Sequence, residues 1–141
     1  MIPDVIWARS IDDCLFLISQ LDCSLYAPFT LLMLEPGSPA AVAEWDGKRL
    51  SIDSDAGSPL TSSSYEPEAV RRERVREFHR FQRGDIAALY RFHTSHAGSS
   101  AAHAPCMHRP DAETVSFSWV TVTADEIRFR YFPAAPCAMA A

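Results

Sequence analysis

The fold is decided by the runs Val115-Ser116-Phe117-Ser118-Trp119-Val120 (residues 115–120) and Ile127-Arg128-Phe129-Arg130-Tyr131 (residues 127–131). In each run large apolar side chains alternate with small or charged ones, and this period of two is typical of β-strands. The polar residues 123–126 join the runs and can form a hairpin. The sequence therefore predicts two antiparallel strands in the last third of the chain.

A helix and three more strands are predicted in the first third. Over residues 10–21, a capping serine is followed by apolar residues at spacings of three and four, which predicts a helix. The first strand is almost wholly apolar, as is typical of a strand covered on both faces. The second and third flank Asp46-Gly47, a strong hairpin signal. The three strands are predicted over residues 29–34, 41–45 and 48–52.

The middle of the chain predicts a loop and two helices. Residues 53–64 have the Ser, Asp, Gly and Pro content of a loop, and Pro67 then suits the first turn of a helix that Gly84 ends. Asp85 begins a third helix that runs to about His93. Charges of both signs interleave along the second helix, which favours a solvated, salt-bridged face over a nucleic-acid-binding surface. These charges are Arg71, Arg72, Arg74, Arg76, Arg80 and Arg83 with Glu68, Glu73 and Glu77.

The strands are grouped apart from the helices, without regular βαβ alternation. This arrangement predicts an α+β fold with an antiparallel sheet of about five strands and two to three helices chiefly on one face. We expect residues 1–135 to form a single domain, and residues 136–141 to form a flexible tail.

Composition excludes several functional classes. The chain has 141 residues, a formal net charge of -5, 48% hydrophobic residues and 22% charged residues. This composition is ordinary for a globular domain, and the acidic balance argues against partners such as nucleic acid or anionic lipid. The sequence has no apolar run of membrane-spanning length and no leader pattern, so we expect a cytoplasmic protein without a membrane partner. The four cysteines form no CxxC pair and are expected to be thiols.

A group of histidines and a cysteine could bind zinc. Imidazole and thiolate are preferred zinc ligands, and four of these groups could form a tetrahedral site. However, the linker between them is soft and offers no evident second shell, so we expect ordinary surface and strand-entry roles, no convergence and no cofactor. The candidates are His93, His96, His103, Cys106 and His108.

Cys106 and His108 are also candidates for a nucleophile and its base. If this stretch is extended, residues two apart share a face, so the two side chains can meet. The sequence shows no third, orienting residue. A small buried cysteine at the start of a strand remains the alternative interpretation.

Three segments together resemble the later part of the NRDE-motif family, also called the transport and Golgi organisation protein 2 family. They are Tyr26-Ala27-Pro28-Phe29-Thr30-Leu31-Leu32, then Trp45-Asp46-Gly47 with Leu60-Thr61-Ser62-Ser63-Ser64 and the Arg-rich helix, and finally the run from Cys106-Met107-His108-Arg109-Pro110 to Ser116. The resemblance implies part of the αββα sandwich of N-terminal-nucleophile hydrolases. It also implies that Ser62, Ser63 and Ser64 lie near a substrate pocket.

The chain departs from that family at its start. Members carry an amino-terminal Cys and an Asn-Arg-Asp-Glu motif, whereas Ile2 stands second here and the motif is absent. The expected function is therefore an NRDE-family-like domain without catalysis of its own.

Three alternatives remain open. The chain could be the C-terminal half of an amide hydrolase whose partner is the missing N-terminal half. It could be a small zinc-binding domain. It could also be an interaction module that forms a homo-oligomer through an exposed sheet face or edge. The expected contributors to that surface are Phe29, Leu31, Trp45, Phe117 and Trp119.

Overall fold

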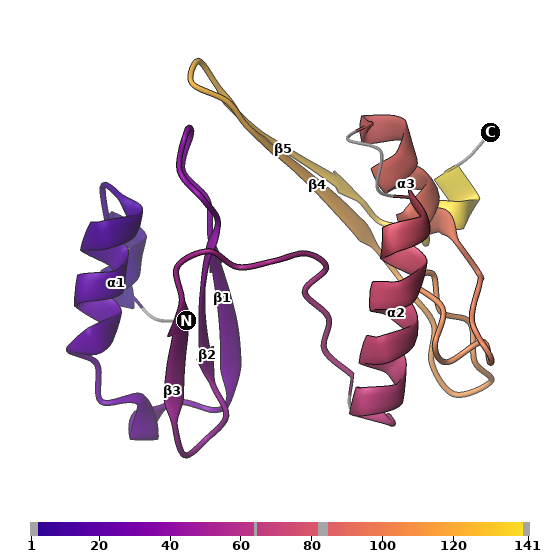
Figure 1. Cartoon of the computed structure of the whole chain (residues 1–141), viewed down its shortest axis with the longest axis horizontal. Coiled ribbons are helices and arrows are strands. Elements are labelled where there is room, and N and C mark those ends of the chain that lie inside the picture. The colour runs from indigo at the N-terminus through magenta and orange to yellow at the C-terminus, as the bar shows by residue number, and fades with distance from the viewer. Residues whose placement is uncertain (1–2, 64, 82–84, 140–141) are drawn as a thin grey trace. The chain divides into compact units, whose positions relative to one another are not determined.

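The computed structural model describes residues 3–63, 65–81 and 85–139 (Figure 1). The chain divides into two compact units, Met1–Gly57 with Val122–Ile127 and Ser58–Thr121 with Arg128–Ala141. Within the described ranges, no helix has the length and apolar character needed to cross a membrane. The elements are α1 (Ile11–Ser19), β1 (Phe29–Met33), β2 (Ala41–Trp45), β3 (Leu50–Asp53), α2 (Pro67–Phe81), α3 (Ile86–Thr94), β4 (Phe117–Val122) and β5 (Ile127–Phe132), with short 3-10 helices at Pro3–Trp7, Cys23–Leu25 and Pro136–Met139.

In the first unit, α1 packs on a three-stranded antiparallel sheet with β2 at its centre (Figure 1). The Ser10 side chain accepts a hydrogen bond from the backbone N–H of Asp13 and caps α1, as predicted. The register of β1 and β2 pairs Leu31 with Ala43, which aligns their apolar side chains on the face toward α1. The buried centre of this packing comprises Cys14, Ile18, Met33, Ala41 and Ala43.

The exposure of β1 differs from the prediction. We expected a strand covered on both faces, but Thr30 and Leu32 are exposed while Leu31 is half-buried and Met33 is buried. The buried side chains are those that face α1. An apolar strand therefore has the alternating burial of a strand with one covered face.

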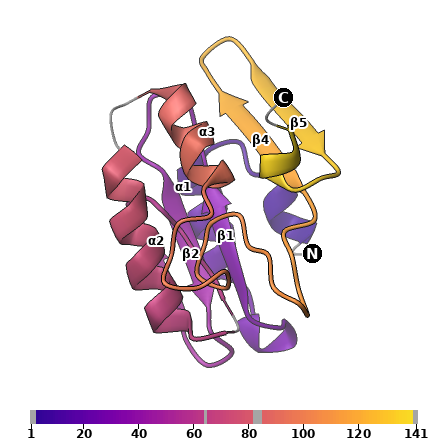
Figure 2. The same ribbon diagram turned by 90° about the vertical axis from the view of Figure 1, so that its right-hand side faces the viewer.

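In the second unit, α2 and α3 lie side by side (Figure 2). The ring of Phe92 on α3 lies 5.2 Å from that of Phe78 on α2, with the two planes nearly perpendicular. Val70 and Phe92 are buried in this layer. The Asp85 side chain accepts a hydrogen bond from the backbone N–H of Ala87 and caps α3. The predicted stop signal for the second helix, Gly84, lies outside the described residues, as does Arg83.

β4 and β5 form the predicted hairpin. The backbone N–H of Thr123 donates to the carbonyl of Glu126 at 2.9 Å and closes the turn. Several apolar side chains of this hairpin are exposed. They are Val120, Ile127, Phe129 and Tyr131.

The apolar residues that we expected on an exposed sheet surface are instead buried or half-buried. Phe117 contacts the rings of Tyr90 and Phe132, which explains its low exposure of 9%. The indole N–H of Trp45 donates to the carbonyl of Tyr26 at 3.2 Å, and Trp45 is buried. The remaining three, Phe29, Leu31 and Trp119, are half-buried.

The α+β class is confirmed, and the five strands are divided between a three-stranded and a two-stranded sheet. In the segment predicted as a tail, residues Pro136–Met139 form a 3-10 helix and Pro136 is buried. This short helix contacts α3 (Figure 2). The hydroxyl of Tyr90 on α3 donates to the Pro136 carbonyl at 3.4 Å.

Candidate metal site and a buried histidine network

Four metal-ligating side chains of the second unit converge. One ligand atom from each of His96, Cys106, His108 and Cys137 lies within 4.8 Å of the corresponding atoms of the other three. The Nε2 atom of His108 lies 3.5 Å from the Cys106 sulfur and 3.4 Å from the Cys137 sulfur. The rings of His96 and His108 are edge to face, 5.1 Å apart. We call these four residues the His2Cys2 cluster.

Local backbone structure explains how three of the ligands meet. The loop after α3 is closed by a hydrogen bond from the backbone N–H of Cys106 to the carbonyl of Ser95 at 3.0 Å. This closure brings Cys106 beside His96, although ten positions separate them. His108 follows two residues later in extended chain, so its side chain lies on the same face as that of Cys106.

The fourth ligand comes from the C-terminal 3-10 helix. The contact between Tyr90 and Pro136 holds this helix against α3. The backbone N–H of Cys137 also donates a hydrogen bond to the Cys106 sulfur. This bond only partly opposes the rise in the pKa of Cys106 that burial causes. The sequence predicts a flexible tail for this segment, so Cys137 was not among the predicted ligands.

The spacing of the ligand atoms suits a tetrahedral zinc ion. With bonds of about 2.3 Å to sulfur and about 2.0 Å to nitrogen, the sulfur–nitrogen edge of a tetrahedron is roughly 3.5 Å. The two measured edges at His108, 3.5 Å and 3.4 Å, match this value. The cluster can therefore receive a zinc ion without large movement of these three side chains.

The nucleophile hypothesis is partly met, because Cys106 and His108 do lie in contact. Burial raises the pKa of the Cys106 thiol, and the neighbouring Cys137 side chain also contributes to the rise. Cys106 is only 1% exposed. A nucleophile must reach its substrate as a thiolate, so this thiol is poorly suited to acyl transfer. A cysteine–histidine pair also gives no role to Cys137 or His96.

A tight turn places a carboxylate behind His108. His108 and Glu113 face each other across an antiparallel bridge, and the backbone N–H of Arg109 donates to the carbonyl of Ala112 at 2.8 Å. The Oε2 atom of Glu113 lies 3.7 Å from Nδ1 of His108, the ring nitrogen that does not face the sulfurs.

His93 lies apart from the His2Cys2 cluster. Its ring packs against those of Phe92 at 5.2 Å and Phe117 at 5.5 Å. Burial lowers the pKa of His93, which keeps this imidazole neutral. It is an ordinary core histidine at the end of α3.

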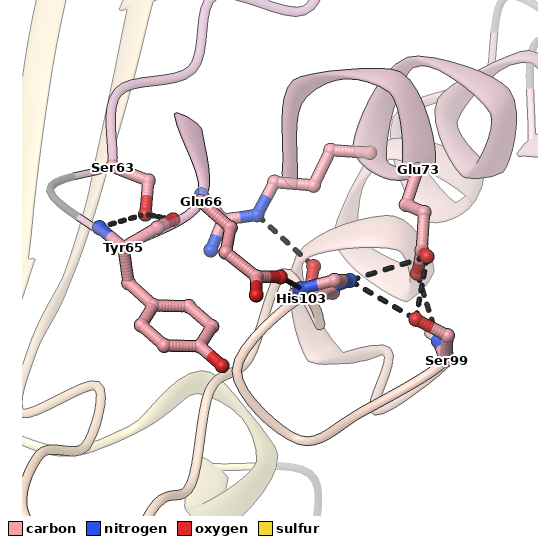
Figure 3. A network of polar contacts seen from close by, with 7 residues as sticks. Ser63, Tyr65, Glu66, Glu73, Ser99 and His103 are labelled. Carbon is pink, nitrogen blue, oxygen red and sulfur yellow. Dashed lines mark hydrogen bonds and ion pairs between the residues drawn. The ribbon is translucent and has the colours of Figure 1, made fainter. Parts of the chain in front are cut away.

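His103 is also separate and belongs to a network of charged groups (Figure 3). Its Nε2 atom lies 3.0 Å from a carboxylate oxygen of Glu66, and its Nδ1 atom lies 3.1 Å from one of Glu73. The Ser99 hydroxyl donates to Glu73 and lies 3.0 Å from His103 Nδ1. The Ser99 backbone N–H donates to the other Glu73 oxygen at 2.7 Å. Both ring nitrogens therefore face acceptors.

The charges in this network stabilise each other. The pKa of His103 is raised, chiefly by its hydrogen bond to Glu73 and also by the one to Glu66. The pKa of Glu73 is lowered to about 2, chiefly by the hydroxyl and backbone N–H of Ser99 and then by His103. His103 is 6% exposed. The network thus favours the protonated form of the His103 ring, which lies between two carboxylates.

Arg74 attaches the same loop to α2. Its guanidinium donates to the carbonyls of His103 at 3.2 Å and Ala104 at 3.1 Å, and to the Thr61 hydroxyl at 2.9 Å. The expectation of a solvated salt-bridged face is wrong for Arg74, because the loop covers this part of α2. A salt bridge of the expected kind joins Arg80 to Glu77 at 2.9 Å.

The backbone just before α2 is strained at Glu66. This residue has φ of 40°, a left-handed conformation that costs a non-glycine residue of order 1–3 kcal/mol. The conformation accompanies the contact of its carboxylate with His103 (Figure 3).

The triple serine precedes this point. The Ser63 hydroxyl donates to the Tyr65 carbonyl at 2.6 Å and accepts from the Tyr65 backbone N–H at 3.1 Å. Ser62 is exposed, and Ser64 lies outside the described residues. Ser63 therefore has a structural role in the turn that leads to α2. The substrate pocket that the resemblance implies for these serines stays a prediction.

Comparisons with protein-family models, with curated proteins and with solved structures find no significant match to this chain. The resemblance to the NRDE-motif family therefore stays a prediction as well.

Proposed function

We propose that this protein is a zinc-binding domain in which the His2Cys2 cluster holds one zinc ion. The observation that carries the proposal is the convergence of four ligand atoms within 4.8 Å. Two of these atoms come from Cys106 and His108, one from His96 at the start of the loop after α3, and one from Cys137 in the C-terminal 3-10 helix.

The donor set favours zinc over other abundant cations. Calcium and magnesium take oxygen ligands, and none of the four groups offers one. Two thiolates and two imidazoles in a tetrahedral arrangement are typical of zinc. Copper is the main competitor on affinity, and geometry and availability normally decide between the two ions.

The site is structural rather than catalytic in this proposal. Catalytic zinc keeps a position open for water or substrate, whereas four protein ligands fill the tetrahedron. The ion would tie together three segments of the second unit, namely the loop after α3, residues 106–108 and the C-terminal 3-10 helix. Zinc would therefore stabilise the second unit.

Metal analysis of the purified full chain tests this function. We expect one zinc per chain after dialysis, and loss of the metal from Cys106→Ser and Cys137→Ser. His93→Ala is the matched control and should retain zinc. His93 lies at the end of α3, three residues before His96, but outside the cluster. Zinc retained by both cysteine variants, or absent from the wild-type chain purified and reloaded under reducing conditions, would contradict the proposal.

The nucleophile alternative predicts a different pattern. If Cys106 and His108 were a catalytic pair, Cys106→Ser and His108→Ala would abolish acyl hydrolysis, and Cys137→Ser would not. In a structural zinc site, loss of either cysteine has the same consequence, which is loss of the ion. The parallel behaviour of Cys106 and Cys137 thus separates the two functions.

A further inference from the structure

We infer that Glu113 is a positioning residue of the metal site, which orients His108 through the ring nitrogen opposite the ion. This inference rests on the proposed function and names a fifth residue that sets the affinity of the same site. Glu113 is not one of the four converging groups, and its contact is with Nδ1 of His108 at 3.7 Å.

The backbone fixes the two side chains on one face. His108 and Glu113 are direct partners in an antiparallel bridge, so their side chains project to the same side of the turn. The turn is held on both sides of the bridge. Arg109 donates to the Ala112 carbonyl at 2.8 Å, and Thr114 donates to the Met107 carbonyl at 2.9 Å. The carboxylate is therefore kept near the ring by main-chain pairing.

The chemistry of a metal-bound imidazole explains the benefit. When Nε2 of His108 faces the ion, the proton of the neutral ring must reside on Nδ1. A carboxylate that accepts this N–H fixes the tautomer, fixes the plane of the ring and makes the ligand more basic. The Glu113 side chain is 65% exposed, so it can rotate to shorten the 3.7 Å contact or share it through a water molecule.

A second carboxylate in the same turn supplies a control. Asp111 pairs with Arg109 at 3.1 Å and is 75% exposed. Replacing either acid by its amide removes one negative charge from the same six-residue turn. If the carboxylates act only through their charge, the two variants should weaken zinc binding to a similar extent. If Glu113 orients His108, only Glu113→Gln should weaken it.

The test measures the zinc dissociation constant of the full chain by competition with a chromophoric chelator. Loss of such a carboxylate typically costs 10- to 100-fold in metal affinity, and we expect this weakening for Glu113→Gln, with one zinc per chain at saturation. Asp111→Asn should bind as tightly as the wild-type chain. Equal affinities of Glu113→Gln and Asp111→Asn would overturn the inference while leaving the proposed function intact. A wild-type chain that binds no zinc would overturn both.

A second measurement separates orientation of the ring from stability of the turn. In a His108→Cys background the ligand has no second N–H, so Glu113→Gln should no longer weaken zinc binding. Weakening of the same size in that background would overturn the inference. If His108→Cys does not bind zinc, the exchange rate of the His108 ring N–H proton in the zinc-loaded chain tests the inference instead. Its NMR signal should exchange faster with water in Glu113→Gln than in Asp111→Asn, and equal exchange would overturn the inference.

Discussion

Two histidine centres of the second unit hold the same loop, and they differ in the charges that surround the imidazole rings. At His103 the protein itself supplies both signs of charge, because two carboxylates surround the ring and favour its protonated form. At His96 and His108 the neighbours are another imidazole and two thiols. Thiols and imidazoles bind a metal ion in their deprotonated forms, so such a group gains stability when the ion binds. The first centre is complete in the chain alone, and the second is the one expected to depend on zinc.

The largest expected effect is that of metal removal. A ligand that binds only the folded chain at 1,000 times its dissociation constant stabilises it by about 4 kcal/mol. Chelation should therefore lower the unfolding free energy and the melting temperature of the wild-type chain. Denaturant titrations with and without a chelator measure this. The unfolding free energy of Cys137→Ser should not change when the chelator is added. An unchanged unfolding free energy of the wild-type chain would show that the second centre does not depend on zinc.

Loss of Arg74 should come next. Arg74→Ala removes donors from two loop carbonyls and the Thr61 hydroxyl, and unsatisfied buried groups cost about 1–3 kcal/mol. Urea unfolding of the zinc-loaded chain measures the change. Arg76→Ala is the matched control, because Arg76 is exposed on the same helix, and it should stay within about 0.5 kcal/mol of the wild type. Equal effects of the two variants would show that the loop does not depend on Arg74.

The His103 network predicts a pH dependence that zinc does not supply. The raised pKa of His103 gives stability that is fully present below the unfolded value of about 6.5 and is lost as pH rises through the folded value. The lowered pKa of Glu73 gives stability that is present above its unfolded value and is lost as pH falls toward about 2. The network should thus contribute most between about pH 4.5 and 6.5.

Variants with the metal held saturating isolate this effect. The stability difference between the wild type and His103→Gln should shrink from pH 6 to the pH at which folded His103 loses its proton. Glu77→Gln is the control variant, because Glu77 lies on the same helix as Glu73 but outside the network. It should leave the pH dependence of the unfolding free energy unchanged. A difference between wild type and His103→Gln that is constant from pH 5 to 10 would refute the imidazolium assignment.

The smallest expected effect is at Ser63. Ser63→Ala removes the hydrogen bonds to the Tyr65 backbone that shape the approach to Glu66, and a typical hydrogen bond contributes about 1 kcal/mol. Ser62→Ala, in the same triple serine, should be close to neutral because Ser62 is exposed. Thermal unfolding compares them. A larger loss for Ser62→Ala would contradict the turn as the role of this segment.

Local sequence pattern predicted what depends on near neighbours. Ser10 and the spacing of three and four gave α1, and alternation gave the β4–β5 hairpin. The cysteine and histidine at 106 and 108 were recognised as a pair because two residues of extended chain share a face.

Long-range contacts could not be predicted in the same way. Cys137 lies 29 positions from His108, and its place in the cluster depends on the 3-10 helix that packs on α3. Arg74 has the same spacing as its solvated neighbours, and its burial depends on a loop that begins some twenty residues later. Glu113 was invisible as a partner of His108 until the turn between them was known.

The most direct test of the central claim is X-ray absorption at the zinc edge of the reloaded full chain. We predict a first shell of two sulfur atoms at about 2.3 Å and two nitrogen atoms at about 2.0 Å for the wild-type chain, and no bound zinc in Cys137→Ser. A first shell of nitrogen and oxygen atoms alone, or a wild-type chain that retains no zinc, would contradict the account.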